Sequence, residues 1–180
     1  MVQDNQPERQ RAITLRFLAE PAHINFGGKV HGGAVMKWLD QAGYTCAANW
    51  TGSYCVTAYV SGIQFLSPIH VGDIVELRAS VIRTGRTSLD VAVDISARSP
   101  QSSERRRTGH CVVVFVAVDD QGKPKPVPRW EPETELDRAL EDYARRLAQL
   151  RKETDVALEE RLAALGVQPT AGQGEALQGG

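Results

Sequence analysis

The stretch VHGGAVMKWLDQAGY, from Val30 to Tyr44, is rich in apolar residues, opens on two glycines and holds one carboxylate, Asp40. At about 100° per residue, its apolar side chains share one face of a helix. That face carries Val35, Leu39, Ala42 and Cys46. We therefore predict a helix over 33–49. An unpaired charge in apolar surroundings costs several kcal/mol, so Asp40 is expected to be partnered or kept for its reactivity.

Five further stretches have the apolar patterning of strands. They cover residues 13–20, 57–69, 74–83, 88–98 and 110–119. The last four are joined mainly by short turns, which favour antiparallel pairing because a parallel crossover needs about a dozen residues. Gly62 suggests a bulge within its strand. The expected fold class is α+β: residues 1–130 form one domain in which an antiparallel sheet wraps around one long central helix.

Residues 131–165 are charged and predict a separate amphipathic helix. Its apolar positions form a narrow stripe that loses register near Thr154. The members before that point are Leu136, Leu140, Tyr143, Leu147 and Leu150, and those after it are Leu158, Leu162 and Leu165. We expect this stripe to pack on the body of the protein or on another subunit. Residues 166–180 are expected to be disordered.

Composition narrows the functional classes. The 180 residues are 42% hydrophobic and 24% charged, as in an ordinary globular protein. The formal net charge is -1, so the protein has no overall positive electrostatic potential that would attract nucleic acid. No stretch approaches the roughly 18 apolar residues of a membrane span, and the polar start shows no secretory signal. Three cysteines without CxxC spacing predict no metal site and a reducing compartment. The expected location is the cytoplasm.

The candidate chemistry lies around the central helix. Asn25 and the pair Gly32 and Gly33 precede Asp40, and glycines at a helix start let a ligand approach backbone N–H groups that suit an oxyanion. Asp40 lies about 10 Å along the axis from Gly33, too far for both to grip one small group. A two-fold dimer would bring Asp40 of one chain against the glycine loop of the other. We therefore hypothesise that the protein acts as a dimer.

Four segments, in order, carry a resemblance to a known family: NFGGKVHGGAVMKWLDQAG, FLSPIHVGD, GRTS and FVAVDDQGKPKPVP. Together they resemble the hotdog-fold acyl-CoA thioesterases, most closely the YciA-type bacterial enzymes and the related animal cytosolic acyl-CoA hydrolases. The resemblance implies a helix enclosed by an antiparallel sheet, and dimers that join two sheets into one. It also implies assembly of dimers into hexamers in many members. The implied reaction is hydrolysis of acyl-CoA to free acid and CoA, with no metal and no cofactor besides the substrate.

The same resemblance suggests roles for individual residues. Asp40 matches the catalytic carboxylate, as general base or as nucleophile, and Asn25 matches a residue that positions water or the carbonyl from the opposite subunit. Gly33 would supply an oxyanion N–H. The expected contacts to substrate and CoA are Gly32, Gly85, Arg86, Thr87, Ser88 and Arg105. Arg105 belongs to a run of three arginines that suits the phosphates of CoA or is merely a solvated hairpin loop.

Alternatives remain for several of these positions. Asp40 can be a structural carboxylate paired with Lys37, Asn25 can simply hold a turn, and the glycines can serve close packing. His31 either acts as a base or is a buried histidine satisfied by backbone. The HGG triplet also occurs in the phenylacetyl-CoA thioesterase branch, so an aryl-CoA substrate, phenylacetyl-CoA or hydroxybenzoyl-CoA, stays open. A non-catalytic acyl-CoA-binding regulatory module is the alternative from a different class.

Overall fold

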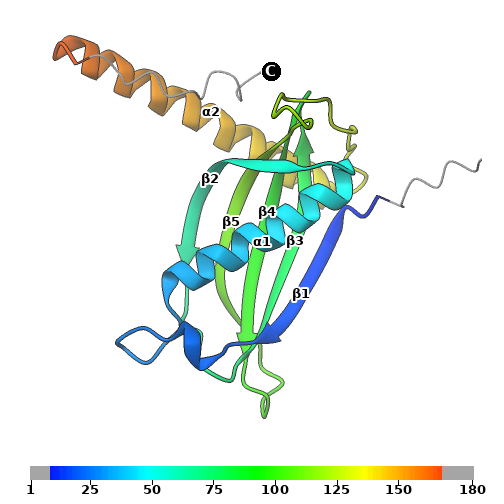
Figure 1. The fold of residues 1–180 in the computed structure, drawn as a ribbon, viewed down its shortest axis with the longest axis vertical. Coiled ribbons are helices and arrows are strands. Elements are labelled where there is room, and N and C mark those ends of the chain that lie inside the picture. Colours follow the sequence, from blue (N-terminus) through cyan, green and yellow to red (C-terminus); the bar gives the residue numbers. More distant parts are fainter. Residues whose placement is uncertain (1–8, 168–180) are drawn as a thin grey trace, which may run out of the picture.

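The computed structural model describes residues 9–167 and contains one five-stranded antiparallel sheet between two helices (Figure 1). The strand order is β1-β3-β4-β5-β2. The strands are β1 (Ala12–Leu18), β2 (Cys55–Phe65), β3 (Ile74–Thr84), β4 (Ser88–Arg98) and β5 (Arg106–Ala117). Helix α1 (Gly32–Thr51) lies against the inner face of the sheet, and α2 (Glu135–Ala164) lies on the outer face. The predicted α+β fold class is confirmed.

The core lies between α1 and the inner face of the sheet. Strand β4 alternates as its sequence predicts, with five side chains inside the main apolar cluster: Leu89, Val91, Val93, Ile95 and Ala97. Close approach of the helix requires Gly43, because a Cβ at that position would lie 2.9 Å from the Phe115 ring. The predicted apolar face of α1 is therefore the face that packs on the sheet.

Helix α1 begins one residue earlier and ends two residues later than the periodicity predicts. His31 caps its start, where Nδ1 accepts a hydrogen bond of 2.8 Å from the N–H of Gly33. Gly52 closes the end in the left-handed conformation, with φ of 63°. His31 therefore makes a backbone hydrogen bond as expected, but the expectation that it is buried is wrong, because the helix start lies at the surface.

Strand β2 forms one edge of the sheet, and its outer edge is paired with no other described strand. Its pairing with β5 shifts register between Thr57 and Tyr59 and again between Ser61 and Gln64. The second shift contains Gly62, which has φ of 49°, so the predicted bulge is confirmed. Strand β5 begins four residues before the predicted position because Arg106 already pairs with Ala97.

Helix α2 begins at Glu135 rather than at residue 131. Thr134 and Asp137 form a capping box, and Arg11 binds the Asp137 carboxylate at 2.5 Å. The helix covers a small apolar patch on the outer face of the sheet, made of Ile82, Ala92 and Val112. Most of the tail predicted to be disordered, residues 168–180, lies outside the described residues.

Candidate active site

Asp40 projects from the side of α1 that faces β2. Its Oδ1 accepts a hydrogen bond of 2.6 Å from the Thr57 hydroxyl. The expectation of a carboxylate enclosed by apolar groups is wrong for the single chain, where Asp40 is exposed. The reason is topological: β2 is an edge strand, so nothing beyond it covers this side of the helix. Within residues 9–167, Asp40 is bonded to Thr57 and not to Lys37, the partner that the sequence offered as an alternative.

Sequence reasoning missed Thr57. It occupies an inward position of β2, opposite the core residue Phe115, where the alternation would otherwise place an apolar side chain. The sequence did offer one signal for Thr57, which is a hydroxyl side chain at an inward-facing position of an otherwise apolar strand. Its meaning depends on which helix residue lies across from it, and this is fixed only by the three-dimensional register.

Asn25 holds a tight loop just before α1. Its Oδ1 accepts hydrogen bonds from the N–H groups of Gly27 at 2.9 Å and Lys29 at 3.2 Å. The side chain therefore performs the turn-holding role that the sequence left open. Phe26 stands at the tip of this loop, and its ring has no protein cover in the single chain.

Asn25 and Gly32 line a common cavity of about 380 Å³. Phe65 and the buried Thr108 also line it, and the Thr108 hydroxyl has no hydrogen-bond partner among the described residues. Asp40 is not part of its wall. Within one chain, the glycine end of the helix and the catalytic candidate therefore stand apart, as the helical rise requires.

The two glycines differ in what their N–H groups can do. The N–H of Gly33 donates to His31, whereas no acceptor in the described part of the chain meets the N–H of Gly32. Gly32 also faces the cavity, while a Cβ on Gly33 would lie 2.9 Å from the His31 ring. The free donor at the start of α1 is thus Gly32, one residue before the predicted oxyanion donor.

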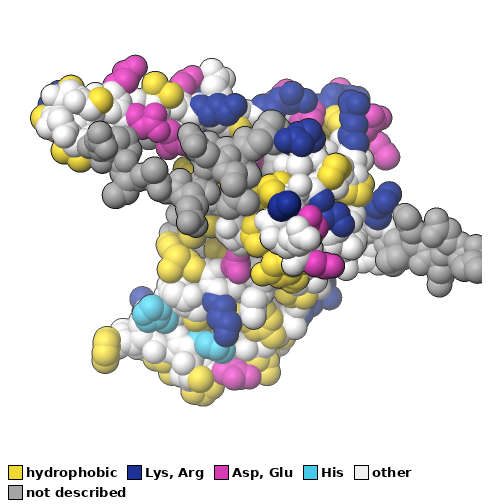
Figure 2. All heavy atoms as spheres, turned by 45° about the horizontal axis from the view of Figure 1, so that its top comes forward, with side chains coloured by type: hydrophobic (Ala, Val, Ile, Leu, Met, Phe, Trp, Pro, Cys, Tyr) yellow, Lys and Arg dark blue, Asp and Glu magenta, His cyan; other side chains and the backbone are white. Residues whose placement is uncertain are grey.

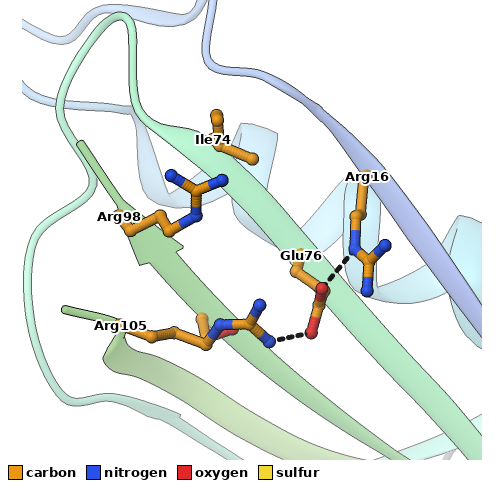
Figure 3. Close-up of a pocket in the computed structure, with 6 residues that line it drawn as sticks. Arg16, Ile74, Glu76, Arg98 and Arg105 are labelled. Carbon is orange, nitrogen blue, oxygen red and sulfur yellow. Dashed lines mark hydrogen bonds and ion pairs between the residues drawn. The ribbon is translucent and has the colours of Figure 1, made fainter. Parts of the chain in front are cut away.

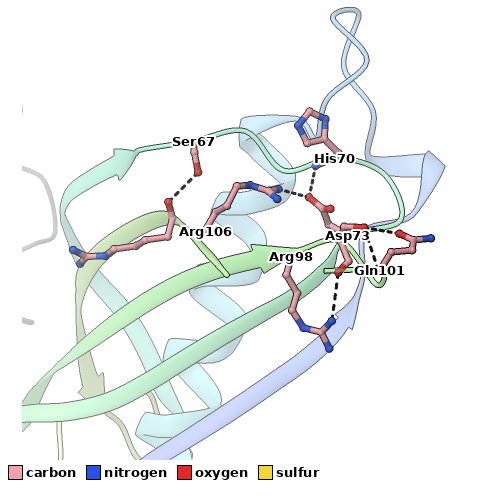
Figure 4. A network of polar contacts seen from close by, with 8 residues as sticks. Ser67, His70, Asp73, Arg98, Gln101 and Arg106 are labelled. Carbon is pink, nitrogen blue, oxygen red and sulfur yellow. Dashed lines mark hydrogen bonds and ion pairs between the residues drawn. The ribbon is translucent and has the colours of Figure 1, made fainter. Parts of the chain in front are cut away.

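The loop between β2 and β3 forms one wall of this cavity and is fixed by a buried carboxylate (Figure 4). Asp73 accepts hydrogen bonds from the N–H of His70 at 2.9 Å and from the Arg106 guanidinium at 2.7 Å. The Ser67 hydroxyl donates to the carbonyl of Arg107 at 2.9 Å. The bonds of Asp73 to Arg106 and of Ser67 to Arg107 tie the loop to β5.

The predicted CoA contacts lie far apart in one chain. The turn Gly85–Ser88 joins β3 to β4, and Thr87 within it is buried. Arg86 accepts from the N–H of Val127 through its carbonyl at 3.0 Å. Arg105 lies near the opposite end of β3, which at about 3.4 Å per residue is roughly 30 Å away. One chain does not bring these two groups to a common site.

Arg105 instead belongs to a basic depression on the outer face of the sheet (Figure 3). Arg16 and Arg105 both bind the carboxylate of Glu76 there, and Arg98 lines the same depression of about 260 Å³. Burial opposes ionisation of Glu76, but the two guanidinium groups outweigh it and lower the pKa of this carboxyl. Arg16, Glu76 and Arg105 therefore form an ion-pair network.

No cluster of three or more histidine, cysteine, aspartate or glutamate side chains is placed to hold a metal ion in residues 9–167. Within the same range, no helix is long and apolar enough to cross a membrane.

The sequence and the structure both match known proteins. Residues 27–104 match the Thioesterase superfamily. The acyl-CoA thioester hydrolase YciA of Salmonella typhimurium is 34% identical over 128 residues, which span 69% of this chain and 95% of the relative. A crystal structure of an apo-hexameric acyl-CoA thioesterase has a TM-score of 0.78 and 34% identity, covering 83% of this chain and 96% of its own.

The acyl-CoA hydrolase of Staphylococcus aureus, solved with butyryl coenzyme A and coenzyme A, has a TM-score of 0.77 at 28% identity. The match covers 87% of this chain and 95% of that one. Its solved variants include alanine replacements of an asparagine, an aspartate and a threonine, separated by 15 and 17 positions. The same spacings separate Asn25, Asp40 and Thr57.

Proposed function

We propose that this chain, which belongs to the thioesterase superfamily, hydrolyses acyl-CoA to a free carboxylic acid and CoA, with Asp40 as its catalytic carboxylate. The observation that carries the assignment is the hydrogen bond between Asp40 and Thr57 beside the free edge of β2. It supports a site at the edge of β2, where a second chain would complete the surroundings of the carboxylate. The matching spacing of Asn25, Asp40 and Thr57 in the Staphylococcus aureus hydrolase supports the same three residues.

The geometry suggests how water is activated. The Thr57 hydroxyl donates its hydrogen bond to Oδ1 of Asp40. The other carboxylate oxygen, Oδ2, is then the atom that takes a proton from water. The water oxygen attacks the thioester carbonyl, and the C–S bond then breaks as the sulfur of CoA gains a proton. Negative charge on the carbonyl oxygen is stabilised by the N–H of Gly32 at the positive end of α1 in the other chain of the dimer. In the nucleophile alternative, a carboxylate oxygen of Asp40 attacks the carbonyl, the C–S bond breaks and the CoA thiolate leaves. Water then hydrolyses the resulting mixed anhydride to the free acid and regenerates Asp40.

We place this active site between two chains joined through β2. A long edge strand with unpaired backbone groups is a template for another strand, and β2 exposes apolar side chains along its length. Pairing of two β2 strands gives one continuous sheet and brings the loop of Asn25 and Phe26 toward Asp40 of the partner. It also covers the ring of Phe26, which is bare in one chain.

Three further features of the proposal follow from this chemistry. The reaction needs only water, a carboxylate and backbone donors, so we propose that it uses no metal and no cofactor besides the CoA of its substrate. The hexameric relatives support assembly of three such dimers. All three cysteines are free thiols, and burial raises the pKa of Cys46 and Cys111 to about 12, which suits a cytoplasmic protein.

The test is release of free CoA, detected with a thiol reagent, from acetyl-, octanoyl-, palmitoyl- and phenylacetyl-CoA. Asp40→Asn should lower kcat/KM by about a hundredfold or more, equivalent to roughly 2.7 kcal/mol of transition-state stabilisation. The matched control is Asp142→Asn, an exposed carboxylate on α2, which should keep full activity. Preference for phenylacetyl-CoA would select the aryl-CoA reading. Binding without any CoA release by the wild type would contradict the enzyme and favour a binding module.

A further inference from the structure

The apolar face of α2 repeats after five turns. Leu140, Ala144 and Leu147 pack on the outer face of the sheet. Adding 18 residues, which is five turns at 3.6 residues per turn, leads to Leu158, Leu162 and Leu165. The second set therefore points in the same direction as the first, about 27 Å further along the axis. The apparent break in the stripe near Thr154 separates two copies of one contact pattern.

The helix crosses the strands in their spatial order. Its first turn is held by Arg11 near the start of β1, and its middle covers residues of β3, β4 and β5. The guanidinium of Arg151 then stacks on the ring of Tyr59 in the edge strand β2, 4.7 Å from the ring centroid. Arg151 thus marks where α2 reaches the edge of its own sheet.

The helix does not end there. Residues 152–164, which we call the overhang, continue for about 20 Å beyond Arg151. In Figure 1 this end extends past β2, and in Figure 2 it stands clear of the sheet with hydrophobic side chains among charged ones. Leu158 is 57% exposed and Leu165, at the end of the helix, is 63% exposed. A sheet-facing apolar stripe thus continues where the chain has no sheet to offer.

We propose that the overhang packs on the outer sheet face of a second copy of this chain. The occupant follows from continuity: if β2 pairs with β2 of another copy, the sheet continues in the same plane directly beneath the overhang. Adjacent strands lie about 4.8 Å apart, so an advance of 20 Å spans the partner's nearest strands. This inference rests on the dimer proposed above. Each α2 then packs on the outer face of the other chain's sheet, whereas the active site lies on the inner face.

The experiment measures dissociation of the assembly into single chains by sedimentation at decreasing protein concentration. Leu158→Glu combined with Leu165→Glu places charges on the sheet-facing stripe and should weaken association by about a hundredfold or more. The control is Val156→Glu, which lies in the same overhang but about 160° away around the helix and is 53% exposed. It should leave association unchanged.

A second readout needs no variant. Backbone amides of 152–164 should exchange slowly with deuterium in the assembled protein and quickly after dilution to single chains, while those of 140–147 stay protected in both. Equal association of the double variant and wild type, with rapid exchange of the overhang in the assembly, would overturn the inference and leave the β2 dimer intact. A wild type that is active as a single chain would overturn both the contact made by the overhang and the proposed β2 dimer.

Discussion

The two helices lie on opposite faces of one sheet and are buried to very different extents. Seven of the 20 residues of α1 are buried, against two of the 30 residues of α2. Helix α1 is held by apolar contact so close that Gly43 has no room for a side chain. Helix α2 is held by a capping box, the ion pair with Arg11, a small apolar patch and the stacking of Arg151 on Tyr59. The inner helix can therefore fix a catalytic carboxylate precisely in place, whereas the outer helix leaves apolar surface for a partner.

This contrast predicts different costs for one substitution in the two helices. Leu39 is almost fully buried in the main core, so Leu39→Ala should lower the free energy of unfolding by about 2–5 kcal/mol. Leu147 is half-buried over the outer patch, and Leu147→Ala should cost less than half as much because part of its surface is already in water. Urea unfolding of both variants measures the two losses. Equal losses would contradict the difference in burial between the helices.

A smaller effect is expected at the contact between α1 and β2. Thr57→Val removes the hydrogen bond to Asp40, and a bond to a charged group contributes about 1.5–3 kcal/mol. If that bond aligns the carboxylate, kcat should fall about tenfold to a hundredfold. Thr57→Ser keeps the hydroxyl and should retain most of the activity. Full activity in the valine variant, with an unchanged melting temperature, would show that Thr57 has no role in orienting Asp40.

The smallest effect concerns the start of α2 and depends on pH. The backbone N–H of Thr134 lowers the pKa of the Asp137 carboxyl, and the bond to Arg11 lowers it further. Because the folded-state pKa lies below the unfolded-state value of about 3.9, the ionised group stabilises the fold at pH values above that value. The stabilisation is lost as pH falls through the lowered pKa.

Asp137→Asn should therefore be less stable than wild type at pH 6, and the difference should shrink as pH falls below about 4. Thermal unfolding across this range measures it. Asp142→Asn, on the same helix without such partners, serves as the control and should match wild type throughout. A difference between Asp137→Asn and wild type that persists unchanged at pH 3 would contradict the role of the ionised carboxylate.

The sequence was sufficient for features that depend on local periodicity. Helical spacing placed α1 to within two residues at each end, and strict alternation placed β4, because each pattern reports one buried face. The exposure of Asp40 was not predictable in this way, because it depends on β2 being an edge strand. Thr57 was missed for the same reason: its partner lies 17 residues away and is chosen by register.

The predicted CoA contacts show a second limit. Arg105 and the turn Gly85–Ser88 both match chemistry that binds phosphates or the CoA arm, yet they lie at opposite ends of β3. Residue type and spacing describe what a group can bind, whereas strand topology decides which groups meet. Whether two chains bring them to one ligand stays a prediction.

The central claim is that one active site takes Asp40 from one chain and Asn25 from its partner. Its most direct test is complementation between Asp40→Asn and Asn25→Ala, coexpressed with different affinity tags and purified through both. Each variant alone should be nearly inactive. Assemblies that carry both tags contain mixed dimers, and each mixed dimer should hold one intact site and one doubly altered site. Activity per chain should therefore rise well above that of either variant, to at most about half of the wild-type value. Mixed dimers no more active than the separate variants would contradict a shared site.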